Sequence, residues 1–161
     1  FLNLTRREAD VALRPTREPP PNLAGRRIGP LASAVYGVPR FADGRPLAEL
    51  PWVGWDEGTG PPPITEWQRR NLPPGGLKLR SNSMLNQALA AEAGIGVAIL
   101  PCFLGAAYAG LTRIAADPAW ETELWLLTHP DLRQTARVRA LLDFLYEGLR
   151  GRRGDLAGAA A

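Results

Sequence analysis

The sequence holds few of the side chains from which enzymes usually build reactive centres. Its 161 residues include one cysteine and one histidine. An internal disulfide is therefore impossible, and the common transition-metal sites, which need several histidine or cysteine ligands, are not expected. Cys102 stands where a strand should lead into a helix and is interpreted as a buried thiol, and His129 is interpreted as a turn residue. We expect no catalytic residue, no metal and no cofactor.

Long hydrophobic runs are also absent. The longest apolar stretches, residues 94–100 and 102–111, are separated by Pro101 and fall short of the roughly 20 residues that span a bilayer. The first five residues lack the basic-then-apolar layout of a signal peptide. The sequence therefore predicts no membrane segment and a cytoplasmic location.

Lysine is nearly missing as well. Lys78 is the single lysine among 19 basic residues, so the other 18 are arginines, and the net charge is only +3. Paired arginines occur far apart and are interrupted by acidic residues. No continuous basic stripe for binding nucleic acid is predicted.

The remaining composition is that of a soluble globular protein of about one domain, with 45% apolar and 22% charged residues. Short apolar runs alternate with stretches of helical periodicity, which predicts an α/β fold with largely parallel sheets. Gly94 is the expected stop of one helix. Residues 151–161 show no periodicity and are expected to form a flexible tail. The expected strands cover residues 9–13, 28–38, 51–55, 77–79, 95–100 and 123–128, and the expected helices cover 64–71, 84–93, 103–109 and 136–149.

Two segments offer chemistry for binding an anion. Ser81-Asn82-Ser83 stands between a predicted strand and a predicted helix, where free backbone amides and polar side chains can hold a carboxylate. Simple capping of the helix explains the same residues equally well. Arg14 follows a predicted strand, and its forked guanidinium suits a carboxylate, although a surface ion pair is the alternative.

The order of several segments resembles the effector-binding domain of LysR-type transcriptional regulators over roughly residues 4–149. The most specific part is Ala-Gly-Ile-Gly-Val-Ala-Ile-Leu-Pro at residues 93–101, together with the helices that flank it. The other matching segments are residues 9–14, 28–39, 81–84, 124–130 and 137–145.

This resemblance implies two Rossmann-like α/β subdomains of the type 2 periplasmic-binding-protein kind, joined by two crossover strands, with a small anionic ligand in the cleft between them. Residues 1–27 and 129–150 would belong to subdomain I, and residues 28–128 would form subdomain II with the crossover strands. The ligand contacts would come from strand ends and helix starts. Carried onto this sequence, those positions are Arg14, Pro15, Trp55, Asp56, Asn82, Ser83 and Pro101.

The sequence departs from the family pattern at its start. Family members carry an N-terminal winged helix-turn-helix and a linker helix, and neither is found here, nor are the first strand and helix of subdomain I. The chain is therefore expected to be N-terminally truncated. Promoter DNA would be bound only through the winged helix-turn-helix of the full-length protein, which would be a homodimer or homotetramer.

The resemblance predicts the sensory domain of a LysR-type regulator that catalyses no reaction. One alternative is a solute-binding protein of a transporter with the same fold, and the lack of a signal peptide argues against it. A second alternative is an enzyme on that fold, which would need a reactive cluster that a single histidine and a single cysteine make hard to build.

Overall fold

The computed structural model describes residues 9–159 and divides the chain into two compact units. Of the described residues, 9–31 and 121–159 form the first unit, and Ala32–Trp120 forms the second. The sequence instead placed residues 28–31 and 121–128 with the second subdomain. They belong to the first unit because these two segments pair with each other as strands. No helix within residues 9–159 is long and apolar enough to cross a membrane.

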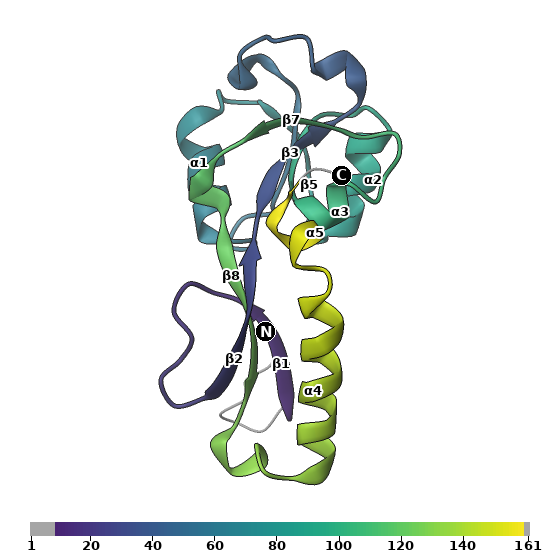
Figure 1. Cartoon of the computed structure of the whole chain (residues 1–161). Coiled ribbons are helices and arrows are strands. Elements are labelled where there is room, and N and C mark those ends of the chain that lie inside the picture. The colour runs from purple at the N-terminus through teal and green to yellow at the C-terminus, as the bar shows by residue number, and fades with distance from the viewer. Residues whose placement is uncertain (1–8, 160–161) are drawn as a thin grey trace. The chain divides into compact units, whose positions relative to one another are not determined.

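The first unit is a three-stranded antiparallel sheet with a long helix beside it (Figure 1). Strand β8 (Thr122–Thr128) lies between β1 (Val11–Pro15) and β2 (Ala24–Leu31). Helix α4 (Ala136–Arg150) begins after Thr135, as its apolar spacing predicts, and the short 3-10 turn Pro130–Leu132 precedes it. Its apolar face covers a core that includes Ile28, Leu124 and Leu126.

The expected flexible tail is in large part ordered. Residues Arg153–Ala157 form helix α5, whose Leu156 is only 6% exposed and packs into the core of the first unit. The Arg153 side chain also donates a hydrogen bond to the Ile28 carbonyl. One turn of helix is too short to show periodicity in the sequence, so only these contacts with β2 reveal it. Residues 160–161 lie outside the described part of the chain.

The second unit holds the remaining strands, which all run the same way except β3 (Ser33–Gly37). Strand β3 pairs antiparallel with both β6 (Ala98–Pro101) and β7 (Thr112–Ala116). Strands β4 (Trp52–Gly54) and β5 (Leu77–Arg80) pair parallel, and a parallel bridge from Trp52 to Val97 links β4 to the start of β6. The strand order is therefore β5-β4-β6-β3-β7. The expectation of largely parallel strands holds for this unit, but not for the antiparallel sheet of the first.

Helices α1 (Pro62–Asn71), α2 (Met84–Glu92) and α3 (Cys102–Gly105) complete the second unit, with 3-10 turns at Pro39–Phe41, Leu47–Glu49 and Pro118–Trp120. Gly94 follows α2 with a φ of 74°. This left-handed conformation suits glycine and ends the helix as expected. Helix α3 is shorter than the predicted 103–109.

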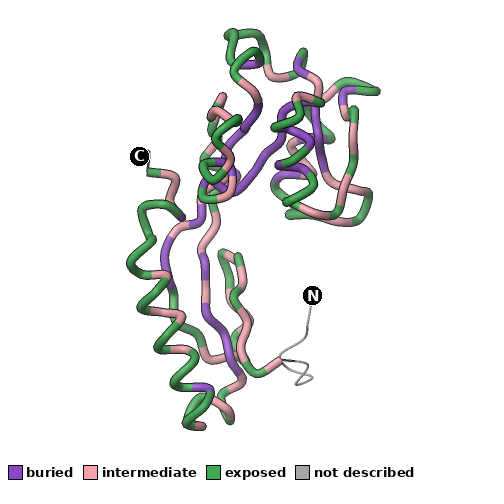
Figure 2. The backbone as a smooth tube through the Cα atoms, turned by 90° about the vertical axis from the view of Figure 1, so that its right-hand side faces the viewer, coloured by how far each residue is buried: buried purple, intermediate pink, exposed green. Residues whose placement is uncertain are grey.

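Neighbouring strand residues of the second unit point into two different cores. Ala34, Ala98 and Leu100 pack in one cluster, while Val35 and Ile99 pack in the other. Because successive side chains of a strand point to opposite faces, the sheet is buried on both sides. Figure 2 shows buried residues running along the strands, whereas much of α4 is exposed. Burial on both faces explains why residues 97–102 read as an uninterrupted apolar run.

The expected strand over residues 28–38 is two strands, one in each unit. Strand β2 ends at Leu31 and β3 begins at Ser33. Between them, the Ala32 carbonyl accepts a hydrogen bond from the Cys102 amide at 2.9 Å. The apolar pattern continues through this point because both halves are buried, so the sequence carries no sign of the break.

Candidate functional site

Three strands of the second unit end beside one another at the same edge of the sheet. Gly54, Arg80 and Pro101 are the last residues of β4, β5 and β6. These strands are parallel and adjacent, so the segments that follow them gather at one edge, which is where open α/β sheets place their ligands. The Ser81 amide donates to the Gly54 carbonyl at 2.9 Å and ties two of these segments together.

The segment after β5 is held by hydrogen bonds around Ser81. The Ser81 hydroxyl accepts from the Ser83 amide at 3.2 Å. The Ser81 carbonyl accepts from the side-chain amide of Gln87 at 2.8 Å, and Gln87 is only 1% exposed. Gln87 therefore fixes this turn from inside the unit. The sequence analysis missed this residue, and an amide on the inner face of a predicted helix was the signal that could have identified it.

Ser83 is the N-cap of α2. Its hydroxyl oxygen accepts a hydrogen bond from the Asn86 amide at 3.4 Å. Capping uses an oxygen lone pair and leaves the hydroxyl proton free to be donated, so the two interpretations of Ser83 are compatible. Asn82 is exposed, and its side chain has no hydrogen-bond partner among residues 9–159. Both side chains are thus available as donors at this edge.

Trp55 and Asp56 follow β4. The Trp55 ring packs on Gly60, where an added Cβ would lie 2.4 Å from the Trp55 Cγ atom. The Trp55 Nε1 atom is buried without a partner among the described residues, but Trp120 and Trp125 share this feature, so it does not mark a site by itself. The Asp56 carbonyl accepts from the amide and the hydroxyl of Thr59, which closes a turn. This turn holds Trp55 at the sheet edge.

Pro101 ends β6 and is buried, as is Cys102, which is 2% exposed. The Tyr36 hydroxyl donates to the Cys102 carbonyl at 3.4 Å, and burial raises the pKa of Tyr36 to about 12. The phenol therefore stays protonated at neutral pH. At this position Pro101 contributes shape and apolar surface to the edge.

Arg14 and Pro15 belong to the first unit, so no single unit holds all seven predicted residues. Both lie within β1, opposite Trp125 and Leu124 of β8. Strand β1 thus extends two residues further than predicted, and Arg14 is in the strand rather than after it. The pairing with β8, over a hundred residues away, sets this end of the strand.

His129 and Arg80 are two further residues with side chains that could take part in binding or catalysis. The His129 Nδ1 atom accepts from the Asp131 amide at 3.3 Å, which confirms that His129 is a turn residue. Arg80, at the end of β5, is exposed and adds a positive charge next to Ser81. Its position directly before the polar segment was a signal in the sequence. Within residues 9–159, no three side chains among His, Cys, Asp and Glu gather closely enough to hold a metal ion.

Comparison with known proteins finds one family model, described as the LysR substrate binding domain, which matches residues 2–150. A search of curated proteins finds no match. Among solved structures, the regulatory domain of CrgA, a LysR-type transcriptional regulator from Neisseria meningitidis, is similar with a TM-score of 0.73 and 22% identity, over 92% of this chain and 79% of that one.

Two other effector domains have the same fold at lower identity. The AmpR effector binding domain from Citrobacter freundii gives a TM-score of 0.70 at 14% identity, over 94% of this chain and 80% of that one. The regulatory domain of AphB from Vibrio vulnificus gives a TM-score of 0.60 at 17% identity, over 91% of this chain and 78% of that one. At sequence identities this low, the similarity to these solved structures shows a shared fold and no more.

Proposed function

The chain belongs to the LysR substrate-binding domain family, and from this membership we propose that it binds a small organic anion at the carboxyl edge of the sheet in its second unit. As a member of this family it is the effector-sensing domain of a LysR-type regulator. The family is non-enzymatic, and a transporter's solute-binding protein is not favoured as an alternative.

The observation that carries the proposed site is the convergence of donors at one sheet edge. Asn82 and Ser83 stand at the start of α2, a nine-residue helix with no acidic residue in its first turn. The helix dipole and the free amides of that turn therefore favour a negative charge there. Trp55, Asp56 and Pro101 border the same edge, and their role is shape and orientation. Arg14 belongs to the first unit, so its contact with an anion stays a prediction from the sequence.

Effector binding is proposed to act by shifting a population of conformations. The chain passes between the units twice, at residues 31–32 and 120–121. An effector that binds one arrangement of a dimer or tetramer more tightly raises the population of that arrangement. We further propose that the regulator works in the cytoplasm and that this change reaches promoter DNA through a winged helix-turn-helix.

The test is thermal unfolding of the chain against a panel of small organic acids and neutral metabolites. A ligand at 100 times its dissociation constant adds about 2.7 kcal/mol to the free energy of unfolding. We expect acids of one chemical class to raise the melting temperature. For an acid that does, the Asn82→Ala variant should lose most of the shift and keep the unliganded melting temperature.

The matched control is Asn71→Ala, the same change at an exposed residue that ends α1. It should keep the full shift. If no acid stabilises the chain, or if both asparagine variants respond alike, the proposed site is wrong.

A further inference from the structure

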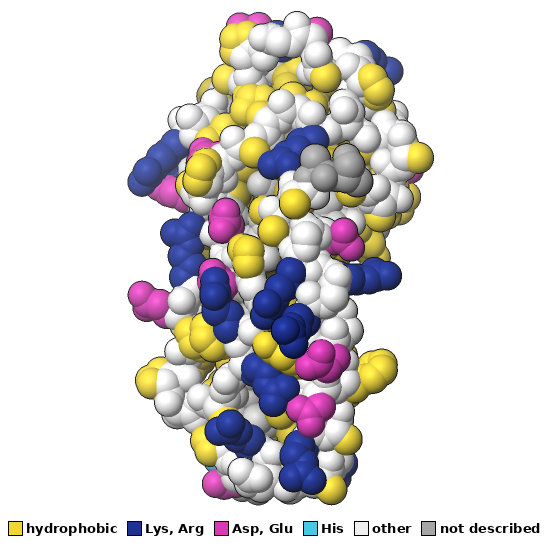
Figure 3. Space-filling model, in the orientation of Figure 1, with side chains coloured by type: hydrophobic (Ala, Val, Ile, Leu, Met, Phe, Trp, Pro, Cys, Tyr) yellow, Lys and Arg dark blue, Asp and Glu magenta, His cyan; other side chains and the backbone are white. Residues whose placement is uncertain are grey.

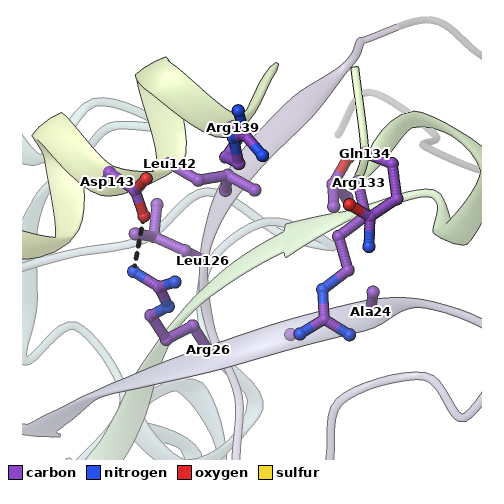
Figure 4. Close-up of a pocket in the computed structure, with 10 residues that line it drawn as sticks. Ala24, Arg26, Leu126, Arg133, Gln134, Arg139, Leu142 and Asp143 are labelled. Carbon is purple, nitrogen blue, oxygen red and sulfur yellow. Dashed lines mark hydrogen bonds and ion pairs between the residues drawn. The ribbon is translucent and has the colours of Figure 1, made fainter. Parts of the chain in front are cut away.

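The first unit has a cavity of its own, separate from the sheet edge of the second unit. Its volume is about 370 Å³, and it lies between α4, the turn before α4, and strands β2 and β8. Figure 4 shows its side chains, which come from all four of these segments. Small-molecule sites generally measure roughly 300–1,000 Å³, so the cavity has room for a compact metabolite.

Arginines dominate the polar lining of this cavity. Arg26, Arg133 and Arg139 line it, against a single acidic residue, Asp143. Figure 3 shows Lys and Arg side chains on the face that carries the first unit, with acidic side chains interspersed among them. Two positive charges therefore remain in excess at the cavity. An anion bound among these side chains would offset that excess of positive charge.

The arginines differ in how they are held. Arg26 Nη1 contacts Asp143 Oδ1 at 3.0 Å, and the Arg26 guanidinium lies 4.6 Å from the centre of the Tyr146 ring. Arg26 thus already has a carboxylate partner. Arg133 and Arg139 have no ion-pair partner among residues 9–159. Figure 4 places Arg133 across the cavity from the Arg26–Asp143 pair, with Arg139 on the α4 side.

Part of the cavity lining is apolar. Leu126, which is 1% exposed, and Leu142 lie on the side of the cavity that carries Arg26 and Arg139, with Arg133 on the opposite side (Figure 4). The nearby Thr128 hydroxyl donates its proton to the Asp10 carbonyl at 2.7 Å, so it is not available as a donor to a ligand. Any anion in the cavity would therefore be held by guanidinium groups, with a nonpolar portion resting on the two leucines.

We propose that this cavity binds a small organic dianion, with its charged groups on Arg133 and Arg139 and its carbon skeleton on Leu126 and Leu142. Two excess positive charges match two negative charges, and the fork of a guanidinium pairs with both oxygens of a carboxylate or phosphate. A dicarboxylate and a phosphate monoester share this chemistry. The site is independent of the one proposed in the second unit.

The experiment is a nuclear magnetic resonance titration of the nitrogen-15-labelled chain with succinate and, separately, with inorganic phosphate. We expect shifts of the Arg133 and Arg139 side-chain Nε signals and of the Gly25 and Gln134 amides. A response to succinate identifies a dicarboxylate site, and a response to phosphate alone identifies a phosphate site. Either response supports the proposal. No response at these residues overturns it, as does binding of an acidic peptide alone.

Substitutions inside and outside the cavity distinguish binding at this site from nonspecific attraction of an anion to a basic surface. Arg133→Gln and Arg139→Gln should each weaken binding about tenfold, since each removes one charge-assisted contact. Asp143→Asn should strengthen binding by removing the competing carboxylate. Arg150→Gln removes the same charge from α4 at a residue outside the cavity. If it weakens binding as much as the cavity variants do, attraction is nonspecific and the proposal fails.

Discussion

At the scale of single residues, the pair of Arg27 and Glu123 joins β2 to β8 through two contacts. Arg27 Nε donates to Glu123 Oε2, and Arg27 Nη2 donates to Oε1, both at 2.6 Å. These hydrogen bonds, and the charge of the guanidinium, hold the pKa of the Glu123 carboxyl below its ordinary value of 4.5. A two-contact pair of this kind fixes the register of neighbouring strands as well as adding attraction.

This lowered pKa predicts a pH dependence of stability. A carboxyl whose pKa is lower in the folded chain stabilises the fold above its ordinary pKa of 4.5, and the contribution is lost as the pH falls through the lowered value. Glu123→Gln should therefore reduce the free energy of unfolding slightly at about pH 7, and the difference from the unaltered chain should be smaller at about pH 3.

Urea denaturation at both pH values measures this difference. Glu57→Gln is the control, since it changes an exposed glutamate that forms no ion pair among residues 9–159. A difference that stays the same at both pH values would show that the pair contributes nothing through its charge.

At the scale of elements, α5 shows how a short segment acquires structure from its neighbours. An isolated helix of five residues is not stable in water. Helix α5 forms because Leu156 packs against the sheet of the first unit and Arg153 bonds to β2. Its order thus depends on the first unit being folded.

Leu156→Ala should therefore destabilise the first unit by roughly 2 kcal/mol, at the low end for a buried leucine because α5 lies near the chain end and can relax. The same change at Leu141, which is 44% exposed on α4, should have an effect within about 0.5 kcal/mol. Urea denaturation followed by circular dichroism compares the two. Equal small effects would mean that residues 151–159 behave as the flexible tail that the sequence suggested.

At the scale of the whole molecule, the two units differ in how much apolar surface they bury. The sheet of the second unit has a core cluster on each face, whereas the first unit has one cluster, centred on β2, β8 and the apolar side of α4. Leu13 of β1 remains 48% exposed. Because burial of apolar surface is the main source of stability, the units should open at different free energies.

Hydrogen exchange followed by mass spectrometry tests this difference without any substitution. Peptides from β8, the central strand of the first unit, should exchange faster than peptides from β3 and β6 of the second. All three strands are paired on both sides, so the comparison is between cores rather than between edge strands. Equal protection of β8 and β3 would indicate that the units unfold as one.

The sequence by itself determined the local features of this protein. The apolar spacing of residues 138–149 predicted α4, and Ser83 and Gly94 marked the two ends of α2. These features depend only on residues that are neighbours along the chain, since caps, turns and periodic faces are properties of short segments. The same local patterns, in their order, carried the resemblance to the LysR effector-binding domains.

Only the tertiary structure decided how distant segments combine. It divided residues 28–38 between two units, reversed β3 within a parallel sheet and ordered α5. It also gathered Trp55, Ser81 and Pro101 at one edge, and placed Arg26 in a cavity with Arg133 and Arg139, over a hundred residues away. The physical reason is that strand pairing and cavity lining depend on contacts between segments far apart in the chain, which no local pattern of residues encodes.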